Sequence, residues 1–337
     1  MIVELPSLLE LFSGLSAPIH TDNRNLYAAA VIPTYERYRI GKDAQGAPAL
    51  LIRLDDSQGR LSPPPIRLQH LFVAHNLDCE IHRQSLVESG RFTVISCIDA
   101  DRPMETYFLQ VLQALLPILG NNPSPGIIND AVDQLIQLFQ ALKNPPRKTT
   151  QGLWAELLVI AEAVDPGFLI DAWHLMPDDL YDFSCGHHRV EVKSASGQIR
   201  RHHFSLAQLL PPGGTVLVVA SVLANRAAAG RTVADLVEEL VSKLANTPER
   251  LLRLYQVVAL TLGDGWRQST LESFDRQAAC QSLTFFDISQ IPTISPELPN
   301  GVSNVHFTAD LTGKIALSRE ELKRHGGLFS VLQHSSK

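Results

Sequence analysis

Alternating apolar and polar residues dominate the first 120 positions of the chain. Short apolar segments lie at residues 26–33, 48–54, 77–83 and 91–98. Gly, Asp and Ser residues separate them, which is the pattern of strands joined by turns. A longer apolar segment at 104–119 predicts a helix after these strands. Residues 1–120 are therefore expected to form a β-rich N-terminal region with a role in target recognition or in docking to a partner.

Two proline-rich segments, at residues 121–126 and 143–152, enclose a helix with one apolar face. Its apolar residues recur at helical spacing: Ile128, Val132, Leu135, Leu138, Phe139 and Leu142. Proline-rich segments are typical of breaks between elements. We interpret residues 121–149 as a connecting helix with its linkers.

Beyond the second break, helical and strand patterns alternate. The pattern predicts a helix at 150–163, strands at 167–173, 179–184 and 189–194, a short helix at 204–210 and a strand at 215–223. Helices at 231–246 and 248–262 and strands at 282–287 and 303–310 follow. The order αβββαβ indicates an α/β domain over residues 150–337.

The composition is that of a globular protein with a weakly acidic balance. Of the 337 residues, 45% are hydrophobic and 19% are charged, and the formal net charge is -6. This charge argues against indiscriminate coating of nucleic acid, because phosphate affinity grows with the number of cations presented. A local basic segment, residues 193–203, contains Arg200 and Arg201 and no acidic residue. It can either contact phosphate or form a solvated loop.

Cysteine spacing and the length of apolar runs indicate the compartment. Cys79, Cys97, Cys185 and Cys280 are far apart and form no CxxC pair, which favours reduced thiols over a zinc site or a disulfide framework. The longest apolar run, residues 215–224, is too short to span a bilayer, and the first residues lack the positive charge of a secretory signal. We expect a cytoplasmic protein with no membrane partner.

The segment YDFSCGHHRVEVKS predicts a β-hairpin. If residues 185–188 form a four-residue loop, Ser184 pairs with Arg189. Counting back two positions on each strand then places Asp182 directly opposite Glu191. The two carboxylates would lie within about 5 Å of each other at their Cβ atoms.

The two faces of this hairpin differ in chemistry. Glu191 and Lys193 share one face with Arg189, because side chains alternate along a strand. The other face is expected to be apolar and to contain Tyr181, Phe183, Val190 and Val192. Two carboxylates opposite each other destabilise a strand pair unless a cation or a proton compensates them.

Lys193 supplies one positive charge, and a divalent ion can supply the rest. Mg²⁺, or Mn²⁺ in its place, prefers oxygen ligands and is held by one or two carboxylates together with a substrate phosphate. Such an ion would polarise a phosphoryl oxygen and lower the pKa of a bound water, while the lysine orients the water or neutralises growing charge. These are the parts that phosphodiester hydrolysis needs. The E-x-K pattern is also common on solvated strand faces, so the hairpin alone leaves both interpretations open.

The helix expected at 150–163 adds a third carboxylate. Thr150 is a candidate N-cap, and Glu156 lies at helical spacing from Gly152 and Ile160 on the apolar side. A carboxylate in that position needs a partner. We therefore group Glu156 with the hairpin residues.

A second aspartate competes with Asp182 for the first metal-binding position. Pro177 and Asp178 form a literal Pro-Asp pair. Asp178 would lie about 13 Å from Asp182 along an extended strand and would pair near Ala195 rather than Glu191. We therefore choose Asp182 and interpret Asp178 as a turn residue.

These residues resemble the PD-(D/E)XK phosphodiesterase superfamily: a helix with Glu156, then Asp182, then Glu191-Val192-Lys193, in an αβββαβ order. More closely, the blocks GLWAELLVI, Trp173, DF, VEVKS and HHFSLAQL are similar to the restriction-associated family of PD-(D/E)XK motif proteins, once described as an uncharacterised domain. The blocks cover roughly residues 150 to 210, and FFDISQIP and GVSNVHFTADL extend the similarity with a weaker signal. The resemblance implies a restriction-endonuclease-like core with a mixed sheet.

The resemblance also implies roles for single residues. Asp182 and Glu191 would bind the metal, Val192 through its backbone carbonyl, and Glu156 directly or through water; Lys193 would be the catalytic lysine. Gln208 would position the site or the nucleic acid, although a plain helix-face amide fits the sequence nearly as well. Ser194, Arg200 and Arg201 would contact nucleic acid.

The activity implied is that of a Mg²⁺- or Mn²⁺-dependent endonuclease that acts on DNA in a restriction or phage-defence system. A methyltransferase or an ATPase of the same system would be a partner, and double-strand cutting would suit a homodimer. Two alternatives stay open. One is a catalytically silent subunit that binds nucleic acid or serves as a scaffold, and the other is a nuclease specific for RNA or for a particular nucleic-acid structure.

Overall fold

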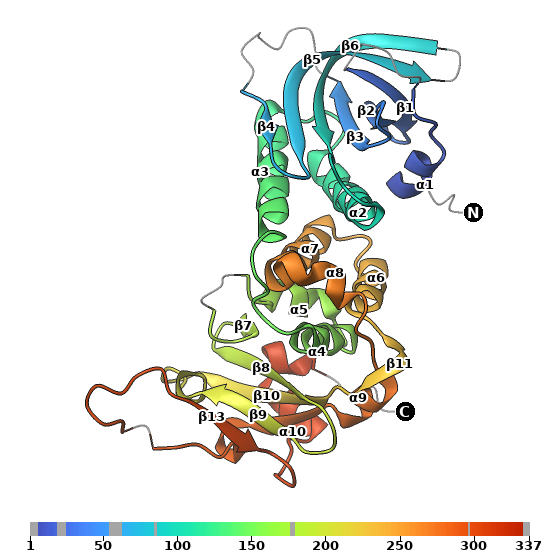
Figure 1. The fold of residues 1–337 in the computed structure, drawn as a ribbon. Helices are drawn as coiled ribbons and strands as arrows, with labels where there is room; N and C mark the ends of the chain where they lie inside the picture. The colour runs from blue at the N-terminus through green and yellow to red at the C-terminus, as the bar shows by residue number, and fades with distance from the viewer. Residues whose placement is uncertain are drawn as a thin grey trace. The chain divides into compact units, whose positions relative to one another are not determined.

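The computed structural model describes residues 6–18, 25–53, 63–83, 86–175, 179–295 and 297–332. The chain divides into two compact units, Met1–Ala141 and Leu142–Lys337 (Figure 1). Each unit has its own sheet and its own helices. The mixed α/β class expected from the sequence is confirmed.

The described part of the first unit contains a six-stranded sheet. Its strands are β1 (Leu26–Ile32), β2 (Tyr35–Lys42), β3 (Pro48–Arg53), β4 (Ile66–Arg67), β5 (Phe72–Arg83) and β6 (Leu86–Ser96). The order is β1-β2-β3-β6-β5-β4, and β1 also pairs with β5 in parallel, so that five strands form a ring. Apolar side chains from these strands form one core cluster: Tyr27, Ala29, Ala49, Leu51, Cys79, Ile81, Phe92 and Val94.

The β2 strand shows why the sequence pattern predicts too few strands here. Charged residues lie between its apolar residues, so the segment lacks the apolar pattern by which a strand is predicted. Arg39 in this strand is nevertheless buried, because Glu88 on β6 accepts a hydrogen bond from its Nε at 3.1 Å. A buried ion pair thus replaces the apolar residue that the pattern requires.

Three helices complete the described part of the first unit: α1 (Leu8–Ser13), α2 (Arg102–Leu119) and α3 (Pro125–Ala141). Asp101 caps α2 by accepting a hydrogen bond from the Met104 amide at 3.1 Å, so the helix begins two residues before the predicted start. The apolar face predicted for α3 is buried from Ile128 to Phe139. The structure groups α3 with the first unit.

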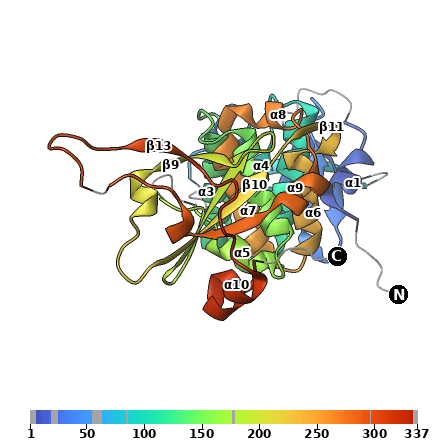
Figure 2. The same ribbon diagram turned by 90° about the horizontal axis from the view of Figure 1, so that it is seen from below.

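A mixed four-stranded sheet lies at the centre of the second unit. Its strands are β7 (Phe183–Cys185), β8 (His188–Ala195), β10 (Val216–Leu223) and β12 (Thr284–Asp287), in the order β12-β10-β8-β7. The pair β8 and β10 is parallel, whereas β7 and β12 run antiparallel to their neighbours. A separate pair, β9 (Arg201–Ser205) and β13 (His306–Asp310), forms a two-stranded sheet (Figure 2). The strand β11 (Arg226–Arg231) makes isolated bridges to Phe274.

Helices pack around this sheet. They are α4 (Thr150–Ala161), α5 (Pro166–Ala172), α6 (Val233–Lys243), α7 (Pro248–Leu262), α8 (Trp266–Ser269), α9 (Arg276–Ser282), α10 (Arg319–His325) and α11 (Gly327–Ser330). Short 3₁₀ turns are η1 (Leu206–Leu209), η2 (Gly263–Gly265) and η3 (Ile288–Gln290). The helix α4 packs against β8 and α6, which brings its side chains to the sheet. None of the helices in the described ranges combines the length and the apolar character of a membrane span.

Two local predictions for the second unit were wrong. Residues 167–173 form the helix α5 and its C-cap rather than a strand, because Asp165 accepts from the Phe168 amide and Pro166 fits the first turn. The short helix predicted near residues 204–210 is present as the 3₁₀ helix η1, which follows directly after β9. The cap of α4 is Thr149, not Thr150.

Candidate metal centre

The hairpin that carries the sequence motif has the predicted register. Ser184 pairs with Arg189, and Phe183 pairs with Val190. Cys185 also pairs with His188, so the loop is shorter than the predicted four residues. Gly186 has a positive φ of 55° in this tight loop, a conformation that glycine adopts without strain.

Asp182 directly precedes β7 and is buried. Its Oδ2 accepts a hydrogen bond from the Val192 amide at 2.6 Å, and its backbone carbonyl accepts one from the His174 amide at 2.9 Å. Its Oδ1 accepts a hydrogen bond from the ammonium of Lys148. The carboxylate is therefore fixed by neighbouring elements on both oxygens.

Glu191 lies in the middle of β8 and is also buried. Its Oε1 accepts a hydrogen bond from Gln208 Nε2 at 2.6 Å and forms an ion pair with Lys193 Nζ at 2.7 Å. Its Oε2 is buried and has no hydrogen-bond partner among the described residues. A buried carboxylate oxygen without a partner is costly and points to a missing cation or water.

Lys193 is held from three sides. Its ammonium contacts Glu191, donates to Gln208 Oε1 at 3.3 Å and lies 5.1 Å from the centre of the Phe204 ring. Gln208 uses both ends of its amide, because its Oε1 also accepts from the Ser205 amide at 3.1 Å. Gln208 thus contacts the acid and the lysine at the same time, and its role in positioning the site stays a prediction.

Tyr181 does not lie on the face predicted for it. It packs in a cluster with Leu217 and Val219 of β10, and Val219 is the register partner of Glu191. Its hydroxyl donates to the Gln208 carbonyl at 3.2 Å. Strand β7 begins only at Phe183, so the strict alternation assumed for the hairpin does not extend back to Tyr181.

Glu156 enters the site from α4, with a side chain only 2% exposed. Its Oε1 accepts a hydrogen bond from Lys148 Nζ at 2.6 Å, and its Oε2 accepts one from Trp173 Nε1 at 2.7 Å. His174 Nδ1 lies 3.8 Å from the same Oε2. One potential ligand atom each from Glu156, His174 and Asp182 lies within 4.8 Å of the others.

Three residues of this cluster were missed by the sequence reasoning. Lys148 precedes α4 in a proline-rich segment that carries no periodic signal. Trp173 belongs to one of the blocks that carry the resemblance, but only the structure shows that its indole nitrogen donates to the buried Glu156. His174 is adjacent to Trp173 and had no partner motif. The sequence signal for these partners is Glu156 itself, because a buried carboxylate needs a donor or a cation beside it.

Burial and mutual repulsion raise the pKa values of the glutamates of the site. Burial, and then the charge of Asp182, raises the pKa values of both Glu156 and Glu191. Burial alone would lower the pKa of Lys148, but attraction to Asp182 and Glu156 outweighs it and raises that pKa. Burial, aided by the Lys148 charge, lowers the pKa of His174. Burial is thus the first cause of the shifts of the two glutamates, and the charge of Asp182 adds to it.

The donor set fits a hard divalent ion. Carboxylate oxygens are the ligands that Mg²⁺ and Mn²⁺ prefer. The oxygen of Glu191 without a partner lies in the same charged network as Asp182, whose charge acts on it. The direct Asp182–Glu191 metal pair stays a prediction, because the close group of ligand atoms contains Asp182 with Glu156 and His174.

The residues expected to contact nucleic acid lie in different surroundings. Arg201 is exposed on β9, and Ser194 is half-buried on β8. Arg200 donates through Nη1 to the carbonyl and hydroxyl of Ser221 at 2.9 and 2.8 Å, and through Nη2 to Thr284 Oγ1 at 3.0 Å. The guanidinium of the half-buried Arg200 thus joins β10 to β12. Asp178 lies outside the described residues.

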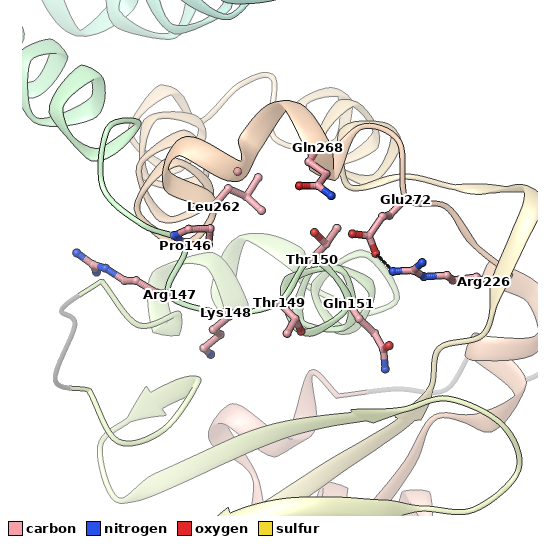
Figure 3. Close-up of a pocket in the computed structure, with 11 residues that line it drawn as sticks. Pro146, Arg147, Lys148, Thr149, Thr150, Gln151, Arg226, Leu262, Gln268 and Glu272 are labelled. Carbon is pink, nitrogen blue, oxygen red and sulfur yellow. Dashed lines mark hydrogen bonds and ion pairs between the residues drawn. The ribbon is translucent and has the colours of Figure 1, made fainter.

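A pocket of about 720 Å³ lies beside the start of α4 (Figure 3). Arg147, Lys148 and Thr150 form part of its wall, and Arg226, which pairs with Glu272 at 2.5 Å, forms another part. Figure 3 shows Lys148 between Arg147 and Thr149, with its side chain pointing away from Gln268. Lys148 therefore belongs to both the pocket wall and the acidic cluster.

Comparison with known proteins gives one family. The family model described as "Putative PD-(D/E)XK family member, (DUF4420)" matches residues 8–312. No curated protein and no solved structure matches the chain.

Proposed function

The chain belongs to this PD-(D/E)XK family, and on that premise we propose that it is a metal-dependent nuclease that hydrolyses phosphodiester bonds in DNA. The observation that carries the proposal is that Asp182 and Glu191 are both buried, that Lys193 pairs with Glu191, and that one oxygen of Glu191 has no partner among the described residues. A solvated strand face would not bury two acids at 4% exposure each.

The metal would be Mg²⁺ or Mn²⁺, held by Asp182, Glu191 and the backbone carbonyl of Val192, with Glu156 binding directly or through water. A bound divalent ion supplies a Lewis acid that polarises a phosphoryl oxygen and lowers the pKa of a water. Lys193, kept in place by Glu191 and Gln208, orients that water or neutralises charge on the phosphoryl oxygens.

The fold proposed for the second unit is the restriction-endonuclease-like αβββαβ core. The succession of α4, β7, β8, β9 and β10 supports it, as does the mixed sheet with a parallel β8–β10 pair. The helix α5 and the pairing of β9 with β13 are additions to that order. The ring of strands in the first unit is proposed to recognise the target or to dock a partner.

We assign the activity to a restriction or phage-defence system, with a methyltransferase or an ATPase as partner and a homodimer for double-strand cutting. A catalytically silent subunit is the main alternative. The presence of all three motif residues supports the enzyme: Glu191 pairs with Lys193, and the charge of Asp182 acts on Glu191. The identity of the nucleic acid is an outcome of the test below.

The experiment is incubation of the purified chain with plasmid DNA, single-stranded DNA and RNA, each with Mg²⁺, Mn²⁺ or a chelator. Cleavage is expected with a divalent ion only, and it should be lost in Lys193→Ala and Asp182→Ala. Lys143→Ala is the matched control: Lys143 is exposed, so this variant should cleave as the wild type does. Cleavage that persists in both site variants, or in chelator, would remove the assignment, and cleavage of RNA alone would move it to a ribonuclease.

A further inference from the structure

Lys148 occupies the position between two buried acids where a cation is needed. Its ammonium contacts Glu156 Oε1 at 2.6 Å and also bonds to Asp182 Oδ1. The carboxylates are 2% and 5% exposed, whereas the lysine side chain is 34% exposed. The lysine thus reaches into the site from its edge.

The other oxygen of each acid already has a donor. Glu156 Oε2 accepts from Trp173 Nε1 at 2.7 Å, and Asp182 Oδ2 accepts from the Val192 amide at 2.6 Å. The oxygens that face Lys148 are therefore the ones through which the two acids can reach a common ion. An ammonium and a metal ion cannot share that central position, because Mg²⁺ needs its oxygen ligands at about 2.0–2.1 Å.

The backbone that carries Lys148 is anchored. The Arg147 amide donates to the Thr261 carbonyl at 2.8 Å, and the Asp264 amide donates to the Asn144 carbonyl at 2.8 Å. The next residue, Thr149, caps α4. Departure of the ammonium from the acids is therefore a movement of the side chain alone, and Lys148 itself lines the adjacent pocket.

We propose that Lys148 is an internal counter-ion that occupies the metal position in the metal-free protein, and that a divalent ion must displace it to bind Asp182 and Glu156. Once displaced into the pocket, the ammonium is placed to bind a phosphate of the substrate beside the metal. The proposal rests on the proposed function, because it assumes that the acids bind a metal. It adds that metal binding competes with a residue of the chain itself.

The first test measures Mn²⁺ binding by isothermal titration calorimetry, without nucleic acid. Lys148→Met should bind Mn²⁺ at least about tenfold more tightly than wild type, since the competing charge is removed at a site of low dielectric. Arg147→Met is the matched control: it removes one positive charge from the adjacent, exposed position and should leave the affinity within about twofold of wild type. Equal or weaker binding in Lys148→Met would overturn the proposal.

A second test uses the wild-type protein and so does not depend on the folding of a variant. Lysines are acetylated with a small anhydride, with and without Mn²⁺, and the peptides are quantified by mass spectrometry. Acetylation of Lys148 should rise several-fold when Mn²⁺ is present, because the released ammonium loses both acid partners, whereas exposed Lys143 should not change. An unchanged Lys148 signal with Mn²⁺ bound would overturn the displacement.

The two failures can be told apart. If wild type binds Mn²⁺ and cleaves DNA but Lys148→Met gains no affinity, only the competition is wrong. If neither wild type nor Lys148→Met binds Mn²⁺, the metal-dependent function is wrong and the competition falls with it.

Discussion

The hydrogen bond from Trp173 to Glu156 gives a sharp test of how the buried acid is stabilised. Trp173 is fully buried, its ring stacks on Phe183 at 6.4 Å, and its Nε1 donates to Glu156 Oε2 at 2.7 Å. Replacing it with Phe keeps an aromatic ring but removes the donor. The remaining carboxylate oxygen would then be buried without that partner.

The chain contains a matched control for this change. Trp154 is also fully buried and lies 5.0 Å from an aromatic ring, that of Phe274, but its Nε1 has no hydrogen-bond partner among the described residues. Trp154→Phe therefore removes a similar volume without removing a hydrogen bond. The difference between the two variants isolates the bond to Glu156.

The magnitude follows from the charge of the acceptor. A hydrogen bond to a charged group contributes roughly 1.5–3 kcal/mol, so Trp173→Phe should be less stable than Trp154→Phe by about that amount. For a unit of this size, 1 kcal/mol lowers the melting temperature by roughly 2–4 °C. We expect a difference of about 3–12 °C between the variants.

The measurement is differential scanning calorimetry of the metal-free protein, with the transition of the second unit followed separately, because two units need not unfold together. Both tryptophans belong to that unit. Equal melting temperatures for the two variants would refute the reasoning and would show that the indole of Trp173 acts by packing alone.

Two further predictions concern the strands behind the site. Burial lowers the pKa of His202 to about 4, so the neutral imidazole stabilises the folded protein fully above the ordinary histidine pKa near 6.5, and this stabilisation is lost as the pH falls towards 4. Urea unfolding should show that the free energy of unfolding falls by roughly 1–3 kcal/mol over this pH range. The fall should be smaller in His202→Gln. Arg200→Gln should lower the free energy of unfolding by roughly 2–3 kcal/mol, because it removes the charged donor to the buried Ser221 carbonyl and to the half-buried Thr284 hydroxyl. Arg201→Gln should leave stability unchanged but weaken DNA binding in a salt titration, and the reverse result for the two arginines would contradict their assignment.

Local patterns allowed the fold around the motif to be predicted. The alternation of Phe183, Val190 and Val192 with polar residues gives the hairpin register, since a shift by one residue would turn every side chain to the other face. The segment of α5 misleads because it is short and apolar, and only the Asp165–Pro166 start distinguishes it from a strand. The β9–β13 pair joins residues about a hundred positions apart, and no local signal specifies such a partner.

The candidate site was predictable to the extent that its acids carry a motif. Glu156 could be placed on a buried helix side, because helical spacing relates it to apolar residues. Its partners could not, because a lysine in a proline-rich loop and an indole nitrogen gain their roles only when the chain brings them together. Sequence reasoning identifies the charge that needs compensation, whereas the structure identifies the group that compensates it.

Counting charge explains why the site is incomplete by itself. Asp182, Glu191 and Glu156 bring three carboxylates, whereas Lys148 and Lys193 bring two ammonium groups. Burial, and then the charge of Asp182, raises the pKa values of the two glutamates, and the neighbouring lysines act in the opposite direction. A divalent ion turns the excess of one negative charge into one positive charge, and a phosphodiester brings one negative charge to meet it. This charge balance favours binding of the metal ion before binding of the substrate. It also requires Lys148, once it has left the acids, to stay close enough to contact the phosphate.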